Sequence, residues 1–182
     1  MLPGKPAPFA EPVFLNQLPN IYLLTGPIRS GKTTALQRWA DSLSGVGGFL
    51  TPDGFNGQRI LQDLRTGKRH PFEAKLSDLS NQEEKLVEVG RFHFYEAGFR
   101  QGKLLMQLKD SERPLWTLID EVGKLELRDA GWMPELETLI DGYRNASLHG
   151  NLLLVVRDSL LKEVIRKFSL DTATIWTPRD LK

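Results

Sequence analysis

The segment Ile21-Tyr-Leu-Leu-Thr-Gly-Pro-Ile-Arg-Ser-Gly-Lys-Thr-Thr34 decides the fold of this chain. Its first five residues form an apolar run, which is typical of a strand buried on both faces. Beyond the glycine-rich stretch, apolar residues from Leu36 to Leu43 recur at the spacing of one helix face, which predicts an amphipathic helix over 32–44. A strand, a glycine-rich loop and a helix in this order form the context in which a backbone loop binds phosphate.

The loop itself satisfies the pattern G-x-x-x-x-G-K-[ST]. Glycines let the backbone N–H groups turn inward toward phosphate oxygens, and the helix N-terminus adds a partial positive charge. Lys32 is expected to reach the β- and γ-phosphates, Thr33 to ligate Mg²⁺, and Thr34 to lie near the α-phosphate. Arg29 is read as a solvated side chain on the rim. The predicted phosphate-binding residues are Gly26, Pro27, Ile28, Arg29, Ser30, Gly31, Lys32, Thr33 and Thr34.

A second apolar strand, over Pro114–Ile119, ends in the acidic pair Asp120-Glu121. Such a strand delivers carboxylates to the carboxyl edge of an α/β sheet, where ligands bind. Asp120 is predicted to hold Mg²⁺ through its water shell. Glu121, one residue further, is placed to orient and deprotonate an attacking water, an arrangement that suits hydrolysis better than transfer to a bound hydroxyl.

P-loop proteins with such a glutamate usually carry an extra strand between the phosphate-loop strand and the Asp-Glu strand. The nearly all-apolar run Asn151–Val156 is the candidate for it. Arg157 would then face the γ-phosphate and could stabilise the transferring phosphoryl group. The alternative interpretation of Arg157 is a surface arginine beside a helix cap.

The rest of the chain alternates strands and helices, which predicts a mostly parallel sheet covered on both faces. We therefore expect an α/β three-layer sandwich over 20–182. Short half-apolar runs around Thr66-Gly67-Lys68 predict an antiparallel hairpin insertion, at about 56–75, on the edge of that sheet. Further expected elements are a strand over Val46–Phe55, a polar loop over 75–90, a strand over Arg91–Tyr95, helices ending near Leu108 and beginning near Pro134 and Asp158, and a last strand over Thr172–Thr177.

Composition narrows the remaining possibilities. The chain has 182 residues, a length typical of one domain, and residues 1–19 carry enough prolines to predict an extended arm. With no cysteine and 3 histidines, a disulfide framework or a thiolate metal site is excluded and a histidine metal site is disfavoured. A formal net charge of +1 gives no reason to expect nucleic acid or an anionic membrane as a partner. The expectation is a cytoplasmic protein that is monomeric or weakly homo-oligomeric.

Two further motifs resemble the thermophile-type nucleoside triphosphatase family, which includes the cancer-related nucleoside triphosphatase of animals. Gly47-Gly-Phe-Leu-Thr51 follows the first helix, and Asp120-Glu-Val-Gly-Lys-Leu-Glu126 is similar to that family's second motif. The resemblance implies a RecA-like sheet and slow, Mg²⁺-dependent hydrolysis of ATP, GTP and other triphosphates. It also implies a role for Lys124, which can fold back toward the phosphates; an ion pair with Glu126 is the alternative. The chain departs from the family at Pro52, which precedes Asp53 where an acidic residue often follows the threonine directly.

Three functions compete on these grounds. A nucleoside triphosphatase, with catalytic residues Glu121, Lys32, Lys124 and Arg157 and metal ligands Thr33 and Asp120, is favoured. A nucleotide or small-molecule kinase shares every phosphate contact, and Arg65, Lys68 and Arg69 of the predicted hairpin could form its lid. A non-enzymatic nucleotide-dependent switch is the third. Residues 177–179 are expected near the base of the nucleotide.

Overall fold

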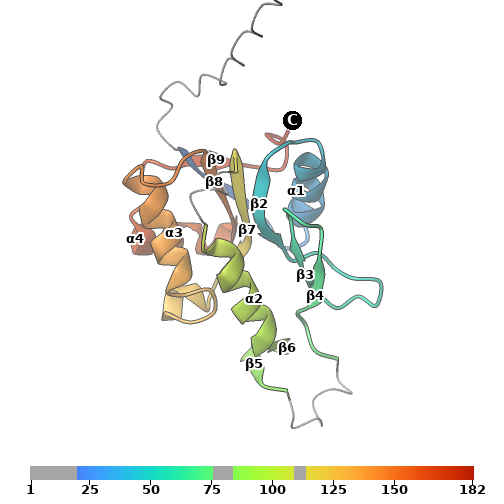
Figure 1. Cartoon of the computed structure of the whole chain (residues 1–182). Coiled ribbons are helices and arrows are strands. Elements are labelled where there is room, and N and C mark those ends of the chain that lie inside the picture. The colour runs from blue at the N-terminus through green and yellow to red at the C-terminus, as the bar shows by residue number, and fades with distance from the viewer. Residues whose placement is uncertain (1–19, 76–83, 109–113) are drawn as a thin grey trace, which may run out of the picture.

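The structure is a computed structural model that describes residues 20–75, 84–108 and 114–182. Its main sheet contains both parallel and antiparallel strands. The proline-rich arm predicted over 1–19 lies outside these residues. Five strands run parallel and two antiparallel strands extend one edge. Figure 1 shows these two, β3 and β4, beyond β2. The strand order is β4 (Arg69–Pro71), β3 (Ile60–Asp63), β2 (Val46–Leu50), β7 (Trp116–Val122), β8 (Asn151–Arg157), β1 (Asn20–Gly26) and β9 (Thr174–Trp176).

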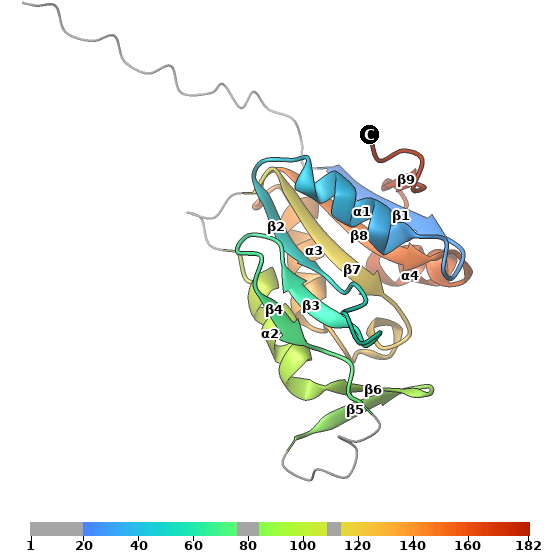
Figure 2. The same cartoon turned by 90° about the vertical axis from the view of Figure 1, so that its right-hand side faces the viewer.

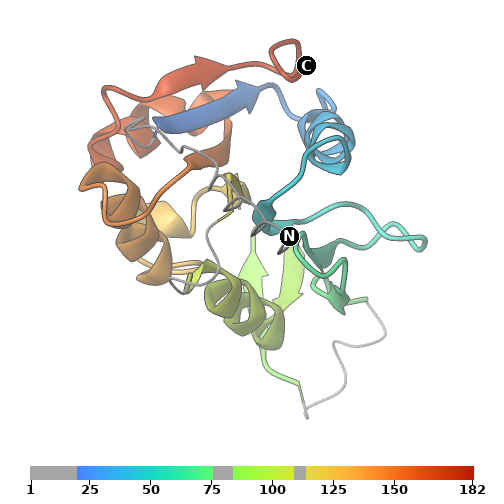
Figure 3. The same ribbon diagram turned by 45° about the horizontal axis from the view of Figure 1, so that its top comes forward.

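Helices cover both faces of this sheet, which confirms the three-layer sandwich. One face carries α1 (Lys32–Asp41). The other carries α2 (Glu96–Met106), α3 (Glu135–Arg144) and α4 (Leu161–Phe168), and Figures 1 and 3 show α1 apart from these three. The short 3₁₀ turns η2 (Glu126–Arg128) and η3 (Asp158–Leu160) follow β7 and β8.

The strand order places β8 between the phosphate-loop strand β1 and the acidic-pair strand β7. This confirms the central position predicted for the run beginning at Asn151. Its ladder with β1 runs in register from Asn20↔Asn151 to Gly26↔Arg157. The residue that ends β8, Arg157, is therefore level with the first glycine of the phosphate loop.

The parallel strands divide the core into two apolar layers because successive side chains point to opposite faces. In β1, Leu23 packs toward α2, α3 and α4, whereas Leu24 packs toward α1. Both side chains are fully buried. On the α1 side, Tyr22 and three tryptophans, Trp39, Trp116 and Trp176, form a contiguous aromatic cluster with ring centroids 4.4–5.9 Å apart.

A second, two-stranded sheet stands apart from the main one. It consists of β5 (Leu86–Val89) and β6 (Phe92–Tyr95), which pair antiparallel. It is joined to the chain after β4 by a bridge between Glu73 and Phe94, and Figure 2 shows it next to the antiparallel edge. The prediction of a polar loop over 75–90 is therefore wrong for 86–89, because pairing with β6 makes this segment a strand. Residues 76–83 of the predicted loop lie outside the described residues.

Two further boundaries differ from the sequence-based expectation. The strand predicted over Val46–Phe55 ends at Leu50, since Pro52 has no N–H to continue the ladder and only an isolated bridge joins Asp53 to Arg59. The first helix ends at Asp41 rather than near residue 44. The antiparallel hairpin of β3 and β4 is present at the sheet edge, as predicted.

Glycines at 98 and 102 allow α2 to lie close to its neighbours. A Cβ at Gly98 would lie 2.6 Å from the ring of Phe72, and one at Gly102 would lie 2.5 Å from the ring of Trp132. Neither distance is compatible with a real side chain. The helix therefore packs directly against the rings of Phe72 and Trp132, which belong to the apolar core on this side of the sheet.

We expect Gly48→Ala to destabilise the protein by about 3 kcal/mol, which is the sum of a strained backbone and a steric clash. Gly48 has a φ of +84°, and a Cβ there would lie 2.1 Å from the carbonyl oxygen of Leu118 on the neighbouring strand β7. Gly67→Ala is the matched control, because Gly67 has a φ of +71° but no atom within 4 Å of the added Cβ. Urea unfolding should give a loss of only about 1 kcal/mol for the control. Equal losses in the two variants would contradict the clash.

Candidate active site

The phosphate loop, the acidic pair and Arg157 meet at the carboxyl edge of the parallel strands. They line one cleft of about 940 Å³ together with residues from the segment after β2 and from the β5–β6 turn. The lining residues are Ile28, Arg29, Ser30, Gly31, Lys32, Thr33, Thr34, Gln37, Thr51, Pro52, Asp53, Gly57, Arg59, Glu73, Arg91, Phe92, Asp120, Glu121, Val155 and Arg157. The volume is of the size found for small-molecule sites.

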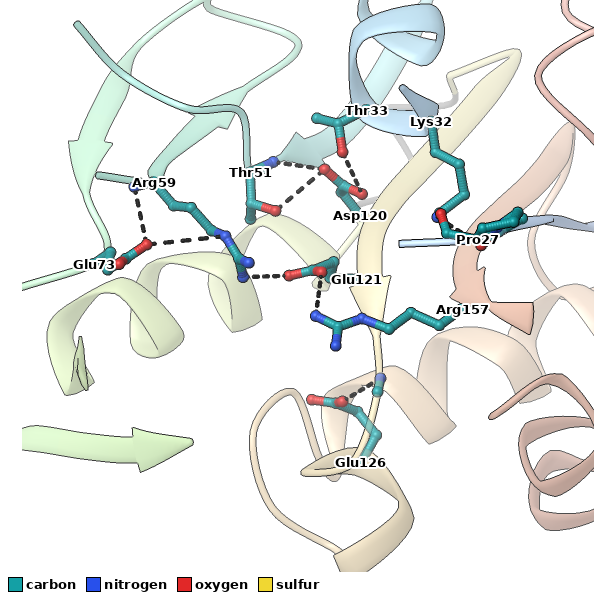
Figure 4. A network of polar contacts seen from close by, with 12 residues as sticks. Pro27, Lys32, Thr33, Thr51, Arg59, Glu73, Asp120, Glu121, Glu126 and Arg157 are labelled. Carbon is teal, nitrogen blue, oxygen red and sulfur yellow. Dashed lines mark hydrogen bonds and ion pairs between the residues drawn. The ribbon is translucent and has the colours of Figure 1, made fainter. Parts of the chain in front are cut away.

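The phosphate loop curls around the side chain of Lys32. Its ammonium group donates to the carbonyl oxygens of Gly26 at 2.8 Å and Pro27 at 2.7 Å (Figure 4). Gly31 adopts a φ of +79° just before α1. Burial is the main cause that lowers the pKa of Lys32, and the carboxylate of Asp158 opposes it. The cationic group is thus aimed into the loop where phosphate oxygens are expected.

Asp120 is fully buried at the floor of the cleft. One carboxylate oxygen accepts from the backbone N–H and the hydroxyl of Thr51, at 3.0 and 3.1 Å. The other accepts only a long hydrogen bond, 3.4 Å, from the hydroxyl of Thr33. Burial, followed by the charge of Glu121, raises the pKa of Asp120. A buried carboxylate beside a threonine hydroxyl fits Mg²⁺, which proteins hold with one or two carboxylates while substrate phosphates complete the shell.

The raised pKa of Asp120 leads to a pH-dependent prediction for the metal-free protein. A folded-state pKa above the unfolded value means that ionised Asp120 costs stability, so this cost grows as the pH rises from about 3.8 through the folded-state pKa. Asp120→Asn keeps an acceptor for Thr51 and removes the charge. Thermal unfolding in a chelator should therefore show the variant to be more stable than the parent at pH 8, with the difference shrinking as the pH is lowered.

The parent protein provides the control for this prediction. Adding Mg²⁺ with a triphosphate should raise the melting temperature of the parent more than that of Asp120→Asn, because a ligand stabilises only in proportion to its binding. A variant that is less stable than the parent at pH 8 without metal would contradict the burial argument.

Glu121 projects from an irregular point of β7. Its φ is +60°, and the register with β8 shifts between Ile119 and Val122. Non-glycine residues adopt such a φ at a cost and often at functional sites. The indole N–H of Trp132 donates to the backbone carbonyl of Glu121 at 3.3 Å and supports this conformation. The bulge turns the carboxylate out of the strand and into the cleft.

Two arginines hold the Glu121 carboxylate, one at each oxygen. Arg157 donates to Oε1 at 2.9 Å and Arg59 donates to Oε2 at 2.6 Å. Figure 4 shows the carboxylate between the two guanidinium groups. The sequence predicted that Arg157 reaches this cleft, but not that it pairs with Glu121. It gave no indication of Arg59, which lies just before β3 and 62 residues from its partner. It also left the contact of Thr51 with Asp120 unassigned, although Thr51 was part of a recognised motif.

Residues 21–173 of the chain match the NTPase family. The chain belongs to this family. The match spans most of the domain and includes every residue of the site described above. It confirms the recognition that the motifs at 47–51 and 120–126 suggested.

Solved structures similar to this NTPase carry the same fold. The solution structure of a human cancer-related nucleoside triphosphatase has a TM-score of 0.59 and 20% identity, with 87% of this chain and 88% of that chain covered. The crystal structure of THEP1 from the hyperthermophile Aquifex aeolicus has a TM-score of 0.61 and 17% identity, with 86% and 88% covered. At these identities the likeness establishes the P-loop NTPase fold.

Curated relatives of the NTPase are much longer proteins. The HTH-type transcriptional regulator MalT of two Klebsiella pneumoniae strains is 27% identical over 150 residues. The aligned part covers 78% of this chain and 16% of the regulator. The chain thus corresponds to a small part of those relatives.

Several residues singled out from the sequence lie away from the cleft of the NTPase. Lys124 is exposed on the turn after β7 and does not line the cleft, and the Glu126 carboxylate instead accepts from the N–H groups of Gly123 and Trp132. Glu126 therefore shapes the turn that follows the acidic pair. The kinase-lid candidates Arg65, Lys68 and Arg69 and the base-loop candidates 177–179 also do not line the cleft.

Clusters of metal-ligating side chains and membrane-spanning helices are both absent from the described parts of the NTPase. Within 20–75, 84–108 and 114–182, no cluster of three or more histidine and acidic side chains forms a metal site. None of the helices in the same ranges has the length and apolar character needed to cross a membrane.

Proposed function

We propose that this NTPase hydrolyses nucleoside triphosphates, including ATP and GTP, to diphosphates and phosphate in the presence of Mg²⁺. The observation that carries the proposal is the position of Glu121. Its carboxylate leaves β7 at a bulge and enters the cleft opposite the phosphate loop, with β8 between the two strands. Magnesium, when bound at Thr33 and Asp120, would supply charge neutralisation at the β- and γ-phosphates.

The reaction follows from the residues in the cleft. Backbone N–H groups of the loop and the ammonium of Lys32 hold the triphosphate with its γ-phosphorus facing Glu121. Water attacks that phosphorus, Glu121 accepts its proton, and the bond to the bridging oxygen breaks so that the diphosphate leaves. Arg157, level with the loop at the end of β8, neutralises the charge that develops. Lys124 would have a role only if its turn folds toward the cleft.

The decisive experiment is a panel of triphosphates with Mg²⁺ in which free phosphate is measured with and without added nucleosides. Phosphate release without an acceptor, lost when the metal is chelated, is the expected result. A rate that rises only when a hydroxyl acceptor is added would favour a kinase instead. If triphosphates bind to the protein but none of them releases phosphate, a nucleotide-dependent switch would be favoured.

The kinase alternative has one observation in its favour. The cleft continues past Glu121 to Glu73, Arg91 and Phe92, where an acceptor molecule could lie. However, the lid that the sequence predicted from Arg65, Lys68 and Arg69 does not line this part of the cleft.

The proposed triphosphatase is a cytoplasmic enzyme that is monomeric or weakly homo-oligomeric and does not have nucleic acid as a partner.

A further inference from the structure

Three of the cations that line the cleft among the described residues are already paired within the protein. Lys32 is bound to two loop carbonyls, and Arg59 and Arg157 are bound to Glu121. The two guanidinium groups therefore form an anion-binding site, which the Glu121 carboxylate occupies. A terminal phosphate carries more negative charge and more acceptor oxygens than one carboxylate, and arginine forks bind phosphate well.

Arg59 is built to remain in place when it gives up this contact. Its guanidinium lies over the rings of Phe92 and Phe94, at 5.3 and 5.7 Å from their centroids. Its Nε lies 3.9 Å from Glu73 on its other side. The rings and Glu73 keep the Arg59 side chain extended toward the cleft. A small movement of its guanidinium group is therefore enough to exchange the Glu121 carboxylate for a phosphate.

We propose that Arg59 binds the terminal phosphate of the triphosphate. In the nucleotide-free protein, Arg59 instead pairs with Glu121 and so keeps this carboxylate from acting on water. When the γ-phosphate enters, Arg59 and Arg157 turn from the carboxylate to the phosphate, and Glu121 becomes available to the attacking water. A diphosphate lacks the phosphate group that competes for the arginines, so it leaves the pairs with Glu121 intact. Arg59 is thus a phosphate-binding and positioning residue that distinguishes triphosphates from diphosphates; this inference rests on the proposed function of the same site.

The test compares the affinities of a non-hydrolysable triphosphate analogue and the matching diphosphate by calorimetry with Mg²⁺. Arg59→Ala should reduce the preference for the triphosphate by about tenfold or more, the scale of a lost charge-assisted hydrogen bond. Arg59→Lys keeps a cation on an apolar stem and should retain part of the preference. Arg128→Ala, which removes an exposed arginine outside the cleft, should leave it unchanged.

Glu121→Gln supplies an independent arm of the test. Removing the charge that competes for the arginines should tighten triphosphate binding several-fold, and this gain should shrink when Arg59→Ala is also present. The proposal is overturned if Arg59→Ala weakens both nucleotides equally, or if it lowers the melting temperature without changing their ratio. Because these measurements need no turnover, an enzyme that fails to hydrolyse any triphosphate would refute the proposed function and still leave Arg59 testable.

Discussion

Lys32→Ala should abolish detectable phosphate release and weaken triphosphate binding. The ammonium group is the only lysine nitrogen that the phosphate loop encloses among the described residues, and it also ties the carbonyls of Gly26 and Pro27 together. Removing it takes away a charge aimed at the transferring phosphate and relaxes the loop. Losing one such electrostatic contact slows catalysis by about 10²- to 10³-fold. Phosphate release under saturating nucleotide and calorimetric binding are the two measurements.

Two controls separate lost chemistry from lost structure in this experiment. Lys32→Met keeps the apolar stem and removes the charge, so it should behave like the alanine variant in activity while remaining closer to the parent in melting temperature. Lys162→Ala removes an exposed lysine on α4 and should hydrolyse at the parent rate. Phosphate release by Lys32→Ala at the parent rate would show that the loop does not hold the reacting phosphate.

Glu121→Gln should slow hydrolysis by about 10²-fold or more while triphosphate binding is kept or strengthened. Glutamine fills the same space but accepts no proton from water, and losing a general base has this scale of effect. The variant also frees Arg59 and Arg157 for the nucleotide. Single-turnover phosphate release measures the chemical step, and a non-hydrolysable analogue measures binding.

The matched control for this variant is Glu137→Gln on the exposed side of α3, which should turn over at the parent rate. If Glu121→Gln hydrolyses triphosphates as fast as the parent, Glu121 is not the base. If it binds triphosphate far more weakly than the parent, the carboxylate does not compete with the γ-phosphate for the arginines.

Local sequence signals sufficed for the parts of the site that are local. The phosphate loop, α1 and the acidic pair each occupy a continuous segment, so residue type and spacing reveal them. The central position of β8 followed from its apolar run together with the glutamate after Asp120. These features account for the order β7-β8-β1 within the sheet and for one half of the cleft.

The other half of the cleft depends on contacts between distant segments, which no local pattern encodes. Arg59 meets Glu121 across 62 residues, and Thr51 meets Asp120 across 69. Arg59 reaches the cleft only because the chain leaves the ladder after Leu50 and returns as β3. Similarly, the strand at 86–89 owes its form to β6, its partner, and not to its own polar surroundings.

The hydrogen bond from the indole of Trp132 to the backbone of Glu121 gives the molecule an intrinsic optical reporter. The chain contains four tryptophans, and the other three belong to the aromatic cluster on the α1 face of the sheet. Trp132 belongs to the opposite layer, next to Phe49 and Phe72. With the three remaining indoles replaced by phenylalanine, the emission of this single fluorophore should follow the conformation of the bulge at Glu121 in real time.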